Sequence, residues 1–237
     1  MTIHIGTSGW AYPSWKPEFY PPKLAAKKFL EYYAAQLNSV EVNYTFRQLP
    51  SEKMLSGWMA ATGPGFTFSF KAPQRITHFA RLKNCREALE QFYLALAPVI
   101  EAKRLGIVLF QLPPNFKANA ELLEEFLSGA QRAPLRLAFE FRHESWFRDE
   151  IFDILKRHQA ALSGAESDEL ESPDVLTASF RCYRLRKSDY SAADLDRLVT
   201  ETKARARDGD VFLYFKHEEA PTGALNAVRL LRRVEED

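Results

Sequence analysis

The chain has 237 residues, of which 46% are hydrophobic and 13% aromatic, so it is long enough to bury a large core and does not have the composition of a disordered protein. Its 32 Lys and Arg residues against 31 Asp and Glu residues give a net charge of +1. This balance excludes a global field that attracts nucleic acid or an anionic membrane. Any selectivity for charged ligands must therefore be local.

The N-terminal residues MTIHIGTSGW lack the charged region and the long apolar region of a signal peptide. No apolar run approaches the roughly 20 residues that span a bilayer, so we expect a soluble, cytoplasmic protein without a membrane partner. Cys85 and Cys182 are far apart and belong to no Cys-x-x-Cys motif. The sequence therefore predicts neither a disulfide framework nor a thiolate metal site.

Short strand-like runs alternate with longer amphipathic runs along the chain, which is typical of parallel β/α units. The pattern predicts eight strands, over residues 3–7, 39–43, 66–72, 106–112, 135–141, 160–165, 180–185 and 211–216. The clearest predicted helices cover residues 24–37, 85–106, 119–132 and 149–160. Eight units in this length fit a (β/α)8 TIM-type barrel better than an open sheet, so we expect residues 1–237 to form one such domain.

Local signals refine two parts of this pattern. Asn119, Ser191 and Thr222 are expected helix N-caps, and Ser191 with Asp194 forms a capping-box-like pair. The stretch ESDELESPDVLTAS after the sixth strand is polar and contains a proline. We therefore expect an irregular sixth β/α unit without a regular helix.

Residue parity in the predicted strands selects a set of candidate site residues. In a barrel, alternate strand residues face the interior, and a charge at inward parity near the C-terminal end of a strand lies at the catalytic mouth. In LRLAFEFR, Glu140 and Arg142 share the face of Ala138, opposite the phenylalanines. The ends of five other strands contribute polar residues to the same ring: Glu41, Asn43, Lys71, Gln111, Arg184 and Lys216.

Two further features flank this ring. His143 directly follows Arg142 and is a candidate ligand-binding or acid/base group. The loop TSGWAYPSWKPEFYPP, residues 7–22, carries Trp10 and Tyr12, which are candidates to stack on a sugar or a base. The alternative is that the aromatic residues of this loop form a plug packed over the rim of the barrel.

Metal binding is the less favoured interpretation of the polar ring. Histidines occur near two glutamates, yet the sequence has no His-x-x-x-His motif or clustered acidic spacing. Lys71 and Arg184 would also repel a cation. We therefore predict no cofactor and no metal ligand.

Six blocks taken together resemble the YecE-like family, the domain of unknown function numbered seventy-two: IGTSGWAYPSW, VEVNYTFRQLPS, FSFKAPQRITH, LFQLPP, FEFRHESWF and YFKHEEAPTGALNAVRL. The resemblance implies a TIM-barrel-like fold and no established reaction. The positions that match the family's polar motif residues are Glu41, Asn43, Lys71, Gln111, Glu140, Arg142, His143 and Arg184.

The chain also departs from the family pattern in three places. It has RLRK at residues 184–187, where relatives read like RLHG, and YFKHE at residues 214–218, where they read like YFNND. It also has SGAESD at the end of the sixth strand, where relatives often carry an aspartate directly off the strand. The resemblance therefore implies that strands six to eight of this chain work differently.

We hypothesise an enzyme that acts on a small polar or anionic substrate, such as a sugar or a sugar phosphate, by hydrolysis or isomerisation. Its predicted catalytic residues are Glu41, Lys71 and Glu140, and its predicted substrate-binding residues are Trp10, Tyr12, Asn43, Gln111, Arg142, His143, Arg184 and Lys216. A Schiff base at Lys71 is a variant of this hypothesis.

Two alternatives remain. The barrel binds nucleic acid or a nucleotide, with phosphates on the cations and bases stacked on the loop aromatics. Otherwise the ring is an inert network of salt bridges, in which charges such as Glu140 only neutralise one another.

Overall fold

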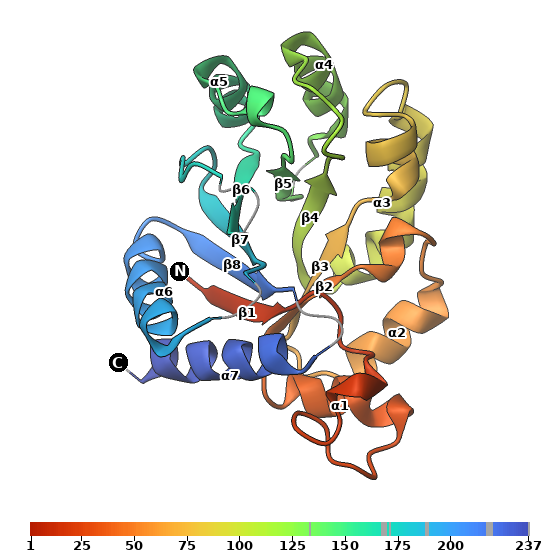
Figure 1. Cartoon of the computed structure of the whole chain (residues 1–237). Helices are drawn as coiled ribbons and strands as arrows, with labels where there is room; N and C mark the ends of the chain where they lie inside the picture. Colours follow the sequence, from red (N-terminus) through yellow and green to blue (C-terminus); the bar gives the residue numbers. More distant parts are fainter. Residues whose placement is uncertain (133, 167–169, 171, 188–189, 217–219, 237) are drawn as a thin grey trace.

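A computed structural model describes residues 1–132, 134–166, 170, 172–187, 190–216 and 220–236. Eight parallel strands form a nearly closed barrel in the order β1-β8-β7-β6-β5-β4-β3-β2 (Figure 1). The strands are β1 (Ile3–Thr7), β2 (Ser39–Val42), β3 (Thr67–Lys71), β4 (Leu105–Gln111), β5 (Leu137–Glu140), β6 (Ala161–Glu166), β7 (Phe180–Leu185) and β8 (Asp210–Phe215). The predicted TIM-type barrel is confirmed, and each predicted strand lies within two residues of an observed one.

Helices surround the barrel on its outside (Figure 1). They are α1 (Phe29–Ala34), α2 (Glu52–Ala60), α3 (Arg86–Glu101), α4 (Ala120–Ala130), α5 (Asp149–Arg157), α6 (Ala192–Arg205) and α7 (Thr222–Glu235). The helix predicted over residues 24–37 is shorter than expected, because its start forms the separate 3-10 turn Ala26–Lys28.

The sixth unit is irregular, as the sequence predicts. Between β6 and β7 the structure describes residues 170 and 172–179, and these contain no helix. Instead, the Thr177 hydroxyl accepts a hydrogen bond from Leu162 N at 2.8 Å and donates one to Ala160 O at 2.8 Å. These bonds fasten the connection to the start of β6.

Two of the three expected N-caps are confirmed. The Asn119 side chain accepts from the Leu122 backbone N–H, and Ser191 and Asp194 form a reciprocal capping box. Thr222 is the first helical residue of α7 and not its cap, because Pro221 occupies the cap position.

Apolar side chains of inward parity fill the barrel as a cluster separate from the main core: Ile107, Leu109, Ala138, Ala161, Ala178, Phe180, Cys182, Phe212 and Tyr214. At its centre the Tyr214 hydroxyl of β8 lies 2.8 Å from Ser39 Oγ of β2 and 2.6 Å from Ser69 Oγ of β3. These strands are not neighbours of β8 in the sheet, so the hydrogen bonds cross the interior. Glu140 and Arg184 are the next inward positions on β5 and β7, and they therefore lie above this apolar cluster, toward the mouth of the barrel.

The seam between β1 and β2 is joined largely through side chains. Asn38 accepts from Ile5 N at 2.8 Å and donates to Ile3 O at 2.9 Å. At the mouth end, Gly9 N donates to Glu41 O at 2.8 Å. The seam is tight, since a Cβ atom on Gly6 would lie only 2.0 Å from the Ser39 carbonyl oxygen.

Candidate active site at the barrel mouth

A fully buried arginine connects the two candidate glutamates. Arg184, near the end of β7, donates from Nη2 to Glu41 Oε1 at 2.6 Å and from Nη1 to Glu140 Oε2 at 2.5 Å. None of the three side chains is exposed to solvent. The parity of three separate strands thus brings the predicted charges into direct contact.

Further groups complete this network. Glu140 Oε1 accepts from Arg142 Nε at 3.0 Å and from Arg186 Nη2. Gln111 Oε1 accepts from Arg184 Nη1 at 3.3 Å, and Ser8 Oγ donates to Glu41 Oε1 at 2.7 Å.

The side chains of Ser8 and Arg186 are members of the network that were not predicted from the sequence. A signal existed for Arg186, because it follows Arg184 by two residues and shares its parity. Ser8 directly follows β1, and its hydroxyl has no comparable signal in the sequence.

The network keeps Glu41 ionised. Burial alone would raise the pKa of this carboxyl, but the Arg184 charge and the hydrogen bonds from Arg184 and Ser8 outweigh burial, so the pKa is lowered. Glu41 Oε2 is buried and has no hydrogen-bond partner among the described residues. One oxygen of an ionised carboxylate is thus left for another group.

A cavity of about 490 Å³ opens at the mouth, beside this network. Among the described residues, four of those that line the cavity are basic and none is acidic; this lining consists of Tyr12, Asn43, Tyr44, Phe46, Arg47, Gln48, Lys71, Arg184 and Lys216. Asn43 Oδ1 is buried without a hydrogen-bond partner in the described part of the chain. The arrangement favours a ligand that carries negative charge together with polar groups.

The surroundings of Lys71 in the cavity alter its acid/base chemistry. Burial, followed by the charge of Arg184, lowers its pKa to about 7, although Glu41 acts in the opposite direction. Arg142 and Lys216 lower the pKa further. The amine lies 4.1 Å from the centre of the Phe46 ring. Near neutral pH, Lys71 can therefore both accept and donate a proton.

The aromatic side chains of the loop over residues 7–22 have different surroundings. Trp15, Phe19 and Tyr20 are buried in the core, as the plug alternative predicts. Tyr12 lines the cavity, and its hydroxyl donates to Ser8 O at 2.8 Å. Trp10 instead packs edge-on against Trp58, with ring centroids 5.2 Å apart, and is not a lining residue.

His143 has a local structural contact beside the network. Its Nδ1 accepts from Ser145 N at 3.1 Å and caps the short turn Glu144–Trp146. The proton of a neutral ring is therefore on Nε2. Unlike Asn43, Lys71, Arg184 and Lys216, it does not line the cavity.

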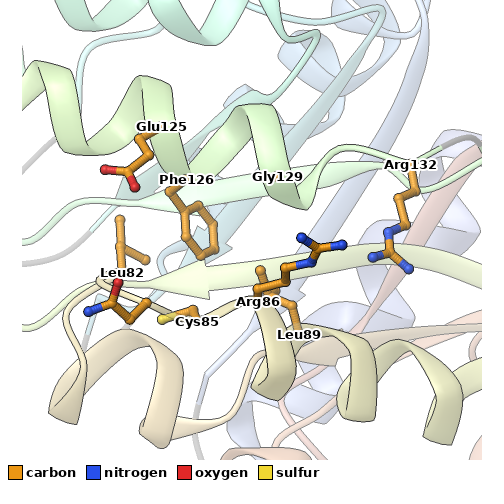
Figure 2. A pocket seen from close by; sticks show the side chains of 9 residues that line it. Leu82, Cys85, Arg86, Leu89, Glu125, Phe126, Gly129 and Arg132 are labelled. Atoms are coloured by element: carbon orange, nitrogen blue, oxygen red, sulfur yellow. The ribbon is translucent and has the colours of Figure 1, made fainter.

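The described residues include a second cavity, but no candidate metal site and no helix that could span a membrane. A second cavity of about 410 Å³ lies outside the barrel between α3 and α4, where Arg86, Phe126 and Arg132 line it (Figure 2). It contains none of the predicted site residues. Within the described ranges, no three His, Cys, Asp or Glu side chains are grouped so that they could hold a metal, and no helix has the length and apolar character to cross a membrane.

The family model described as "Protein of unknown function DUF72" matches residues 4–237. The chain belongs to this family. The resemblance inferred from the sequence blocks is thereby confirmed. A crystal structure of a DUF72 family protein from Thermotoga maritima is similar to this DUF72 chain, with a TM-score of 0.89, 28% sequence identity and coverage of 100% of both chains.

Two curated relatives are similar over part of their length. UPF0759 protein YunF of Bacillus subtilis is 30% identical over 157 residues, which cover 64% of this chain and 54% of the relative. UPF0759 protein YecE of Escherichia coli (strain K12) is 34% identical over 146 residues, which cover 61% and 50%. The matched segment thus spans about half the length of each relative.

Proposed function

We propose that this DUF72 chain is an enzyme that acts on a small anionic, polyhydroxylated substrate of the sugar-phosphate type at the mouth of the barrel. The observation that carries the proposal is the cavity of about 490 Å³, whose lining in the described part of the chain has four basic residues and no acidic one. Small-molecule sites have volumes in this range. Active sites of TIM-type barrels lie on this face of the fold.

The lining residues suggest a division of labour. Arg47 and Lys216 attract and hold the anionic group, and Arg184 adds a charge fixed by its two glutamates. Asn43 and Gln48 offer amide groups to substrate hydroxyls.

Proton transfer is assigned to Lys71 and Glu41. Lys71 has a pKa of about 7, and Glu41 has an ionised carboxylate with one oxygen left without a described partner. Glu140 receives three arginine contacts, which favours a positioning role for this glutamate. This acid/base pair suits either isomerisation or hydrolysis.

Binding measurements test the proposal. We expect isothermal titration calorimetry to detect sulfate, inorganic phosphate and sugar phosphates, with neutral sugars binding at least tenfold more weakly. Lys216→Met should weaken sugar-phosphate binding roughly tenfold, because a hydrogen bond to a charged group contributes about 1.5–3 kcal/mol. Lys117→Met removes an exposed charge from the β4–α4 loop and should leave binding unchanged. Equal binding of neutral sugars and sugar phosphates would overturn the proposal.

Nucleotides and nucleic acid form the competing class of ligand, favoured by Tyr12 and Tyr44 beside the cations. Against this class, Trp15, Phe19 and Tyr20 are buried and offer no stacking surface. Tight, steeply salt-dependent binding of single-stranded DNA, without binding of sugar phosphates, would support the competing class.

A further inference from the structure

Lys71 is the last residue of β3, and its side chain enters the cavity at the mouth of the barrel. In the described part of the chain it forms no ion pair; its amine faces the Phe46 ring at 4.1 Å. The carboxylates of Glu41, which acts on Lys71, and of Glu140 are instead paired with arginines.

Arginine, and not Lys71, neutralises the buried carboxylates of the mouth. Arg184 binds one oxygen of each carboxylate, and no ion pair joins either glutamate to the Lys71 ammonium in the described part of the chain. A lysine that is desolvated or placed next to another cation becomes a nucleophile near neutral pH, because its neutral form is populated. Lys71 meets both conditions, since it is largely buried and Arg184, Arg142 and Lys216 all lower its pKa.

Resting on the proposed function, we propose that Lys71 forms a Schiff base with the carbonyl group of an anionic sugar-like substrate, so that the reaction is an isomerisation of a carbonyl compound. The cationic lining residues Arg47 and Lys216 hold the anionic end of the substrate.

The covalent step balances without a redox partner. The lone pair of the neutral Lys71 amine forms a bond to the carbonyl carbon, and the carbon–oxygen bond breaks. The oxygen leaves as water with the two protons that the nitrogen gives up, and the imine remains. Protonation of the imine by solvent then makes a proton on the adjacent carbon acidic.

Glu41 is the group that we assign to move this proton. Its carboxylate is ionised, and its Oε2 has no hydrogen-bond partner among the described residues. Arg184 both lines the cavity and binds Glu41 Oε1, so it connects the base to the substrate site. The proton leaves the carbon next to the imine for Glu41, and a proton from solvent returns to the opposite face of the same carbon. Water then hydrolyses the imine, which releases the epimerised carbonyl compound and restores the Lys71 amine; the net reaction is an isomerisation.

Borohydride trapping of the full chain tests this inference directly. The protein is incubated briefly with glyceraldehyde 3-phosphate near pH 7, reduced with sodium borohydride, digested and mapped by mass spectrometry. We expect the reduced adduct to form on the Lys71 peptide at least tenfold faster than on the Lys117 peptide. About half of Lys71 is neutral at this pH, whereas an exposed lysine is neutral to the order of one part in a thousand.

Three controls define the outcome. Glyceraldehyde has the same aldehyde without the phosphate and should label Lys71 at least tenfold more slowly. Inorganic phosphate should compete with labelling by the phosphorylated probe. Lys71→Arg keeps the charge and should remove the adduct, whereas Lys117→Arg should retain it.

The results separate this inference from the proposed function. Binding of sugar phosphates without any enrichment of the Lys71 adduct would overturn the Schiff base and leave the anion site standing. A Lys71 adduct that forms equally with both probes, and is not displaced by phosphate, would support the amine chemistry and overturn the anionic substrate class. Labelling spread evenly over surface lysines would reject the inference.

Discussion

Arg184 Nη2 lies 2.6 Å from Glu41 Oε1, and both side chains are fully buried. The same guanidinium reaches Glu140 at 2.5 Å. Burying one unpaired carboxylate costs roughly several kcal/mol. Here two buried carboxylates share one buried arginine. Arg142 and Arg186 supply the remaining positive charge from the rim. Arg184 is therefore the residue on which the arrangement of the mouth depends.

Replacing Arg184 by methionine should strongly destabilise the fold. The substitution leaves the Glu41 and Glu140 carboxylates buried without their shared partner, which typically costs about 3–5 kcal/mol. Urea unfolding followed by circular dichroism measures this loss. The control is Lys28→Met, which breaks an exposed pair with Glu31 and should change stability by less than about 0.5 kcal/mol. Equal effects of the two variants would contradict the central role of Arg184.

Lys71 should make stability rise with pH. Its pKa is lowered from 10.5 to about 7 in the folded state, so between these values the unfolded chain binds more protons than the folded chain. Stability then increases as pH rises through this window, and below it the full cost of the buried ammonium is present.

The comparison that isolates this effect is with Lys71→Met. We expect the unfolding free energy of the wild type minus that of the variant to increase from about pH 7 to about pH 9.5, as measured by urea unfolding. Taking the difference removes the other groups that titrate in the same range. A difference that stays constant over this range would contradict the lowered pKa of Lys71.

Anion binding should be coupled to protonation of Lys71. Sulfate does not titrate near neutral pH, and it favours the charged ammonium over the neutral amine. At about pH 8, where Lys71 is mostly neutral, sulfate binding should therefore take up close to one proton per site. Calorimetry in two buffers of different ionisation enthalpy measures this uptake. Lys71→Arg keeps the charge but does not titrate, and should bind sulfate without proton uptake.

The seam between β1 and β2 should not accept a larger residue at position 6. Gly6→Ala places a Cβ atom 2.0 Å from the Ser39 carbonyl oxygen, and overpacking of this kind costs about 1–3 kcal/mol or more. Gly57→Ala is the matched control. Gly57 lies in α2, where an added methyl group would have no neighbouring atom within 4 Å. Replacing a helical glycine by alanine raises the unfolding free energy by up to about 1 kcal/mol. Thermal unfolding should show a lower melting temperature for Gly6→Ala and a higher one for Gly57→Ala. An unchanged melting temperature for Gly6→Ala would show that the seam between β1 and β2 can open.

The sequence by itself was sufficient to predict the barrel fold, because the spacing of hydrophobic residues within each short segment indicates whether that segment forms a strand or a helix. Runs such as residues 180–185 and 3–7 coincide with β7 and β1, and the polar, proline-containing stretch after β6 correctly indicated a missing helix in the described part of that connection. The same period of two placed Glu41, Glu140 and Arg184 on the inside, since successive side chains of a strand alternate between its faces.

Only the tertiary structure decided how these inward residues are paired. Arg184 binds both glutamates, whereas Lys71 is left facing Phe46 in the cavity. These relationships join residues from β2, β3, β5 and β7, and their distances depend on the tilt and stagger of the closed barrel, which no local pattern records. Burial then acts on the unpaired amine, and for this reason the altered chemistry of Lys71 is a property of the fold.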